Sequence, residues 1–249
     1  MNLTVPASQL QGTSVALPFA HPAHLSLVRA GSMKRDHSTR ERYYASLGID
    51  PCRVVRVDQI HSRSVLVVER SRRVVPGEAA STSGRVAGDG DGLVCAAGGP
   101  WLAIGVGDCV PIYLADLRTR AYGLLHSGWR GTGILESGVR AMQRAFGSSA
   151  ADIAVLLGPG IGACDYAVDS ARARVFARWG DGAVVRRDGI HYLDLFAANR
   201  NLGDRLGVHS VVSVTNSTYA TEQFGSYRRQ GGAGYTGMLA MVGPHARDA

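Results

Sequence analysis

Three polar segments of the chain each contain one side chain that can bind a soft or borderline metal ion. These are His61 in DQIHS, Cys109 in VGDCVP and His126 in LLHSGWRG. Two imidazoles and a thiolate suit a divalent zinc ion and leave a fourth tetrahedral position open for water or substrate. The residue types therefore predict a catalytic metal site. The alternative is a cysteine in the core beside two hydrogen-bonded histidines.

A glycine-rich turn, GWRG at 128–131, follows the second of these histidines. An amphipathic helix is predicted to begin near Thr132, and the free N–H groups and dipole at its start favour an anion. Arg130 would add a fixed charge with bidentate geometry. The turn therefore predicts an anion site, although it lacks the GxxxxGK[ST] pattern of a phosphate-binding loop. A second glycine-rich segment, GPGIGAC at 158–164, fails as a dinucleotide fingerprint because no helix follows it directly.

Strands and helices must position these segments, and their patterns alternate along the chain without a strict βαβ rhythm. Such a pattern predicts a mixed α/β domain with several layers. The segment 77–92, which ends in GDGDG, is interpreted as a long surface loop. The predicted strands are 53–57, 65–68, 102–105, 110–115, 122–126, 153–157 and 209–214, and the predicted helices are 37–47, 133–146, 170–179 and 194–206, the last capped by Gly207.

Composition indicates one folding unit. The chain has 249 residues, of which 45% are hydrophobic and 19% charged, so it can bury a core of its own. Residues 1–35 carry no clear periodicity and are expected to fold together with a catalytic domain at 36–249. Because the chain has no run of 18 apolar residues and no leader pattern, we expect a soluble cytoplasmic protein. Its four cysteines are widely spaced and are expected to be thiols.

The net charge of +7 favours an anionic partner. The arginines are scattered, however, and no basic run of five or more residues occurs. We therefore expect a small anionic substrate, no nucleic acid and no membrane partner. The arginine, glycine and alanine content is also typical of a GC-rich genome.

Seven motifs together carry a resemblance to a known family. They are DQIH, GDGDGLV, GDCVPIYLAD, HSGWRG, LLGPGIGACDYAV, LDLFAANR and SYRRQGG. In this order and approximate spacing, over about residues 53–242, the chain resembles the multicopper polyphenol oxidase or laccase-domain proteins, whose members are also named purine nucleoside phosphorylase and peptidoglycan editing factor. Near the C-terminus the chain departs from its relatives: Gln230 replaces an acidic residue, and Met238 stands where arginine is common.

The resemblance implies an α/β/β/α layered fold in a single domain. It also implies a zinc site made of His61, Cys109 and His126, the same three residues that ligand chemistry selects. The activity implied is phosphorolysis of adenosine, inosine and methylthioadenosine, with adenosine deamination as a side reaction. The protein is expected to be a monomer or a weak homo-oligomer.

The expected mechanism uses zinc to acidify a bound water for deamination, or to hold phosphate facing C1′ of the ribose. Arg130 and one of Arg228 or Arg229 are the candidate anion contacts. Asp108, beside the thiolate, is a candidate proton carrier or orienting group, and capping of a turn is its alternative role.

Three alternatives stay open. Cys109 could be the nucleophile of a metal-free hydrolase or deamidase with His126 as its base, although this leaves His61 without a role. A His2Cys site could take copper and oxidise phenols. A laccase needs several coppers, however, and the eight histidines here supply too few ligand motifs. The third alternative is a role in editing peptidoglycan precursors.

Overall fold

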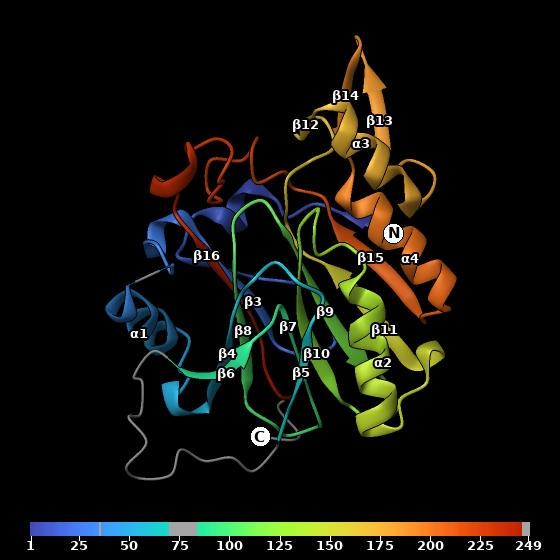
Figure 1. Ribbon diagram of the computed structural model, residues 1–249. Coiled ribbons are helices and arrows are strands. Elements are labelled where there is room, and N and C mark those ends of the chain that lie inside the picture. Colours follow the sequence, from blue (N-terminus) through green and yellow to red (C-terminus); the bar gives the residue numbers. More distant parts are fainter. Residues whose placement is uncertain (35, 70–83, 246–249) are drawn as a thin grey trace.

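The computed structural model describes residues 1–34, 36–69 and 84–245, and these form three sheets and four α-helices (Figure 1). The helices are α1 (His37–Ser46), α2 (Ile134–Phe146), α3 (Ser170–Phe176) and α4 (Leu195–Leu206). The strands are β1 (Asn2–Leu3), β2 (Ser14–Ala16), β3 (Ala23–Ser26), β4 (Val54–Asp58), β5 (Val65–Val68), β6 (Arg85–Asp89), β7 (Gly92–Cys95), β8 (Trp101–Val106), β9 (Val110–Asp116), β10 (Tyr122–Ser127), β11 (Ile153–Leu157), β12 (Ala167–Val168), β13 (Val184–Arg187), β14 (Ile190–Leu193), β15 (Ser210–Val214) and β16 (Met238–Val242).

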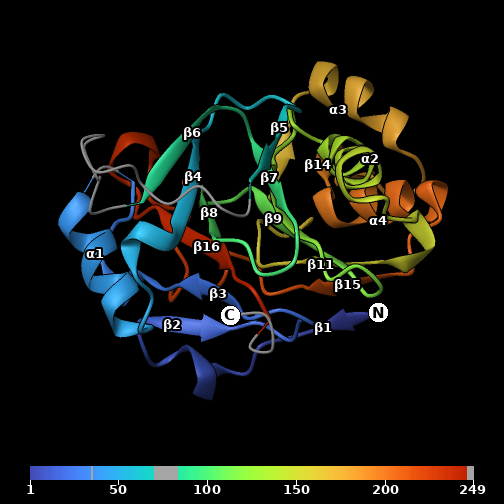
Figure 2. The same cartoon turned by 90° about the horizontal axis from the view of Figure 1, so that it is seen from below.

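Two large mixed sheets face each other. One has the strand order β1-β15-β11-β9-β10-β7-β5 and the other β2-β3-β16-β8-β4-β6. A small third sheet, β12-β14-β13, projects from the body together with α3. Figure 2 shows the layers edge-on, with α1 outside the six-stranded sheet and with α2 and α4 outside the seven-stranded sheet. The expected α/β/β/α fold is therefore confirmed.

Alternation of apolar side chains along the strands explains the layers. In β8, Leu102 and Ile104 point into the core between the two sheets, whereas Ala103 packs on the α1 side. In β10, Leu124 points into the same central core and Leu125 faces the helices on the other side. Since β8 and β10 are apolar on both faces, the two sheets can be covered by helices on their outer surfaces.

The N-terminal residues, for which the sequence predicts no structure, belong to both sheets. β1 pairs parallel with β15, and β2 and β3 extend the six-stranded sheet beyond β16. These strands have only two to four residues each. Runs this short carry too little periodicity to be recognised from sequence.

The interpretation of 77–92 as a loop is wrong where the structure describes it. β6 pairs parallel with β4 at the edge of the six-stranded sheet, and β7 begins at Gly92. Most of β6 is exposed, so its sequence lacks the apolar pattern of a buried strand. Residues 77–83 lie outside the described residues.

Helix boundaries agree closely with the predictions. Asp194 caps α4 by accepting the N–H of Ala197, and Gly207 ends it in the left-handed conformation. α3 is shorter than predicted, because a 3-10 turn replaces the α-helix from Ala177 to Trp179. Among the described residues, no helix has the length and apolar content needed to cross a membrane.

Candidate active site

The structure brings His61, Cys109 and His126 together. Their ligand atoms all lie within 4.8 Å of one another, and the two imidazole centroids are 5.1 Å apart. His61 follows β4 of one sheet, Cys109 lies between β8 and β9, and His126 is in β10 of the other sheet. The cluster therefore sits where strand ends from both large sheets meet.

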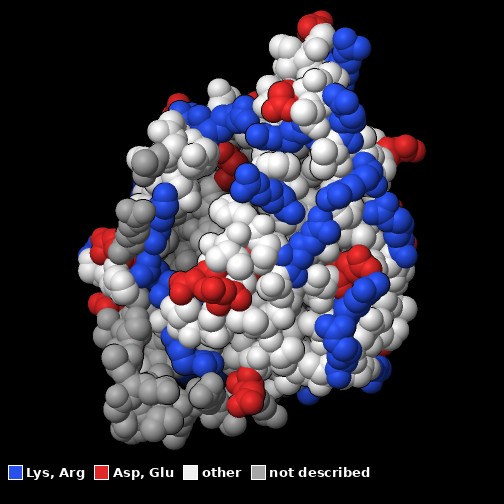
Figure 3. All heavy atoms as spheres, in the orientation of Figure 1, with Lys and Arg blue, Asp and Glu red and all other residues white. Residues whose placement is uncertain are grey.

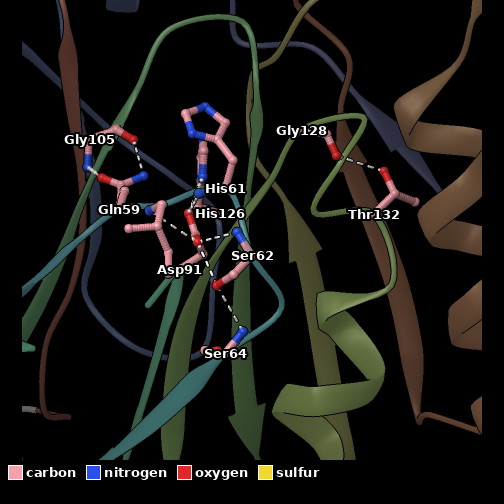
Figure 4. A network of polar contacts seen from close by, with 10 residues as sticks. Gln59, His61, Ser62, Ser64, Asp91, Gly105, His126, Gly128 and Thr132 are labelled. Carbon is pink, nitrogen blue, oxygen red and sulfur yellow. Dashed lines mark hydrogen bonds and ion pairs between the residues drawn. The ribbon is translucent and has the colours of Figure 1, made fainter. Parts of the chain in front are cut away.

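Asp91, between β6 and β7, connects the two histidines, and Figure 4 shows it between the His61 loop and the His126 ring. This buried carboxylate accepts main-chain hydrogen bonds from Ile60, His61 and Ser62. It also accepts the Ser62 hydroxyl at 2.8 Å and lies 2.9 Å from Nδ1 of His126. One carboxylate thus fixes the backbone of the first histidine and the ring of the second.

These contacts shift the pKa values of the groups around Asp91. Burial raises the pKa of Asp91, but hydrogen bonds from His126 and Ser62 outweigh it and hold that pKa at about 2. Burial lowers the pKa of His126, but Cys109 and Asp91 outweigh it and raise that pKa to about 10. Burial and the neighbouring His126 both lower the pKa of His61. Asp91 is therefore ionised near neutral pH and accepts a hydrogen bond from the Nδ1–H group of His126.

The loop that carries His61 is held in a strained conformation. His61 has a φ of 58°, which is uncommon for a residue other than glycine. Besides Asp91, Gln59 restrains this loop through two hydrogen bonds to the backbone of Gly105 in β8. The glutamine and histidine of the DQIH motif therefore serve different purposes, since Gln59 attaches the loop and His61 faces the cluster.

The turn after His126 fits closely against the thiol. A Cβ atom added at Gly128 would lie 2.6 Å from Sγ of Cys109, so no larger residue can occupy that position without displacing the sulfur. The hydroxyl of Thr132 donates to the carbonyl of Gly128 at 2.9 Å and closes the turn before α2. The close approach of the Cys109 thiol thus requires glycine at position 128, the first glycine of HSGWRG.

The cluster opens into a pocket of about 850 Å³, within the usual range for small-molecule sites. Figure 3 shows the hollowed face, with Lys and Arg side chains and some acidic side chains around the opening. Its wall includes the rings of Tyr166, Tyr227 and Tyr235, and the cationic side chains of Arg172 and Arg228. Tyr227 and Tyr235 contact each other edge to face, with centroids 5.4 Å apart.

Asp108 and Arg228 both line this pocket and are connected. The Asp108 carboxylate accepts the main-chain N–H of Arg228 at 2.7 Å and the hydroxyl of Thr218 at 2.8 Å. The Arg228 guanidinium stacks over Tyr166 and donates to the carbonyl of Ala167. Asp108 therefore fixes the position of the segment that carries Arg228.

The other two candidate arginines lie outside the pocket wall. Arg229 turns away and donates to the main-chain carbonyls of Thr218, Tyr219 and Phe224. Arg130 is exposed, and its guanidinium carbon lies 5.2 Å from the centroid of the Trp129 ring. Arg130 is near enough to His61 for its charge to contribute to the lowered pKa of that imidazole.

Sequence reasoning missed Asp91, Arg172 and the three tyrosines of the wall. Asp91 belongs to GDGDG, and the only available signal was an acidic residue immediately before an apolar run. Arg172 is in a short helix with four other arginines nearby at positions 174, 178, 186 and 187, so composition could not select it. These residues reach the site only through the tertiary fold.

The donor set can hold a metal ion. Because the Asp91 contact engages Nδ1 of His126, Nε2 of that ring is left for coordination. A thiolate and two imidazoles suit zinc, and copper is favoured by the same ligands. Asp91 supplies the outer carboxylate that metal-bound histidines usually have.

Comparison with known proteins identifies relatives along most of the chain. Residues 21–243 match the model of the family described as multi-copper polyphenol oxidoreductase laccase. A Deinococcus radiodurans protein named purine nucleoside phosphorylase is 36% identical over 214 residues, which cover 84% of this chain and 77% of that protein. A Streptomyces coelicolor protein, purine nucleoside phosphorylase SCO2081, is 34% identical over 197 residues, covering 77% of this chain and 76% of that protein.

Solved structures share the whole fold. The crystal structure of YlmD from Geobacillus stearothermophilus has a TM-score of 0.82 at 29% identity and covers 94% of this chain and 97% of its own. The Bacillus licheniformis protein YfiH has a TM-score of 0.81 at 25% identity, covering 94% of this chain and 98% of its own. The two large sheets and their helices are thus a shared architecture.

Proposed function

This chain belongs to the multi-copper polyphenol oxidoreductase laccase family, and on that basis we propose that it is a zinc-dependent purine nucleoside phosphorylase of the cytoplasm. The observation that carries the proposal is the cluster of His61, Cys109 and His126 at the base of a pocket with cationic and aromatic walls. Adenosine, inosine and methylthioadenosine are the proposed nucleosides. Adenosine deamination is the proposed side reaction.

Phosphorolysis breaks the bond between N9 of the purine and C1′ of the ribose, and forms a bond between C1′ and a phosphate oxygen. The purine leaves with the electron pair and takes up a proton. The second product is ribose 1-phosphate from adenosine or inosine, and methylthioribose 1-phosphate from methylthioadenosine. The chemistry that zinc supplies in such a site is Lewis-acid polarisation of an oxygen. For phosphorolysis, the protein must therefore bind an anion beside the cluster with C1′ of the ribose facing it.

Arg228 is the proposed anion contact from the pair Arg228 and Arg229, because only its guanidinium lines the pocket. Asp108 positions it through the main-chain hydrogen bond. Arg130 is proposed to add positive potential near His61 rather than to touch phosphate. The rings of Tyr227 and Tyr235 are proposed to bind the purine, because aromatic faces stack on bases.

Phenol oxidation is not the function that we propose, although the site could accept copper. A laccase needs several coppers, and the described residues contain one cluster of three potential metal ligands. Eight histidines in the whole chain leave few for further copper sites. Oxidation of phenols by a copper-loaded form would then be adventitious.

The test combines metal analysis with product analysis. Purified protein should contain stoichiometric zinc, and Cys109→Ser and His126→Ala should each lower metal occupancy and abolish nucleoside cleavage. Cys164→Ser is the matched control, because Cys164 is exposed and lies outside the cluster. Full activity in protein shown by elemental analysis to be metal-free would overturn the zinc proposal.

Chromatography of the products separates the two reactions. Inosine cleavage should require phosphate and yield ribose 1-phosphate, whereas adenosine deamination should proceed in phosphate-free buffer because it consumes only water. Release of free ribose from inosine without phosphate would show hydrolysis instead of phosphorolysis.

A second candidate function is a metal-free cysteine hydrolase. The specific observation is the alignment of Asp91, His126 and Cys109, which matches the orienting acid, base and nucleophile of a catalytic triad. This function leaves His61 unused. His61→Ala therefore discriminates between the two candidates, since it should abolish a metal-dependent activity and leave a cysteine-dependent one largely intact.

A further inference from the structure

Arg172, the third residue of α3, lines the pocket on the side of Trp129. Its guanidinium lies 4.6 Å from the centroid of the Trp129 ring. Within the described part of the chain this guanidinium forms no ion pair and donates no hydrogen bond. Its N–H donors are therefore available to a ligand, while the indole ring restricts its position.

Arg228 lies in a comparable arrangement on the neighbouring wall. Its guanidinium is 5.1 Å from the ring of Tyr166, and it donates a single hydrogen bond, to the carbonyl of Ala167. The charges of Arg172 and Arg228 both act on Tyr166, where each opposes the increase in pKa that burial causes. The same tyrosine is close enough to Cys109 for that thiol to affect its pKa. The guanidinium groups of Arg172 and Arg228 thus line the same pocket as Tyr166 and the candidate metal-binding cluster.

We propose that Arg172 and Arg228 together form the subsite that binds inorganic phosphate, an inference that rests on the proposed phosphorylase function. A guanidinium matches two phosphate oxygens at once, and two of them can balance the charge of a phosphate dianion. Stacking on Trp129 and Tyr166 orders both side chains before the anion arrives, which lowers the entropic cost of binding.

The same arrangement assigns a role to Trp129. Arg172 and Arg130 both stack on its ring, and the ring also packs against the core beneath α2 and α4. Trp129 therefore supports cations rather than a base. The purine is then assigned to the wall formed by Tyr227 and Tyr235, where the Lys34 ammonium lies 4.6 Å from the centroid of the Tyr235 ring.

The test is the phosphate dependence of inosine cleavage in Arg172→Met. Loss of charge-assisted hydrogen bonds should raise the KM for phosphate about 10- to 100-fold, with the KM for inosine changed less than about threefold. Arg174→Met is the matched control, because Arg174 lies on the same helix, is exposed and does not line the pocket. Arg172→Lys keeps the charge and should recover part of the loss. Zinc content should equal that of the wild type in all three variants.

An unchanged KM for phosphate in a folded, zinc-loaded Arg172→Met variant would overturn the inference. An equal increase of that KM in the Arg174→Met control would overturn it as well. Calorimetry of inorganic phosphate binding tests the subsite without any catalysis. It therefore distinguishes a wrong subsite from a wrong phosphorylase proposal. If the wild type lacks phosphate-dependent cleavage, the phosphorylase proposal is wrong. Phosphate affinity at least 10-fold weaker in Arg172→Met than in the wild type would still support the subsite, and equal affinity would reject it.

Discussion

At the residue scale, Asp91 is the side chain that holds both histidines of the cluster. It binds three consecutive main-chain N–H groups at 60–62 and the ring of His126. In Asp91→Asn the amide retains one acceptor oxygen and presents an NH2 group to donors that need an acceptor. Removal of a carboxylate that orients a metal-binding histidine typically lowers metal affinity about 10- to 100-fold. Zinc affinity measured by competition with a chelator should fall by this factor.

Asp89→Asn is the matched control for this residue, because Asp89 belongs to the same GDGDG segment and is exposed. Equal zinc affinity in the Asp91 and Asp89 variants would show that the carboxylate does not hold the ligands. Circular dichroism should remain close to the wild type in both variants, so that a loss of affinity cannot be attributed to unfolding.

At the element scale, the turn between β10 and α2 sets the position of the thiol. Gly128→Ala places a Cβ 2.6 Å from Sγ of Cys109, a contact that only movement of the sulfur or of the turn can relieve. We therefore expect reduced zinc occupancy and at least a 10-fold loss of kcat/KM, with a smaller change in overall stability. Elemental analysis and steady-state kinetics measure the two effects.

Gly12→Ala serves as the control for that substitution, since its added Cβ has no neighbour closer than 3.8 Å. Wild-type zinc occupancy in Gly128→Ala would mean that the turn adapts without disturbing the ligand. The close approach would then be a packing detail and not a requirement of the site.

At the scale of the whole molecule, the core between the two sheets holds the strand ends in register. Leu25 in β3 is completely buried there and contributes to the same cluster as Tyr113 and Leu124 of the opposite sheet. Leu25→Ala should destabilise the fold by about 2 to 5 kcal/mol, which lowers Tm by about 5 to 15 °C in a chain of this size. Well below Tm, kcat/KM should stay near the wild-type value.

Leu117→Ala provides the comparison, because Leu117 is 50% exposed and its truncation creates no cavity. Calorimetry of the two variants measures the difference directly. A similar Tm in both would contradict the assignment of Leu25 to a tightly packed core.

The sequence by itself selected the candidate metal ligands, and it predicted the four α-helices and seven of the sixteen described strands. His61, Cys109 and His126 were selected because few side chain types bind zinc. The amphipathic helices and most of the longer strands were predicted because apolar residues recur along them with the period of the buried face. Short or exposed edge strands such as β1 and β6 escaped prediction because they bury too few side chains to leave a pattern. The buried strand β16 was also missed, because its run MLAMV contains a single β-branched residue.

Tertiary structure alone decided which polar residues act together. Asp91 is 30 residues from His61 and 35 from His126 in the chain, yet it touches both. Arg228 and Arg229 are adjacent and chemically identical, but one lines the pocket and the other binds backbone carbonyls. Local sequence carries no information on such contacts, because they depend on where two sheets bring their strand ends. The physical reason is that hydrogen bonds and charge act over a few ångströms in space, whatever the separation along the chain.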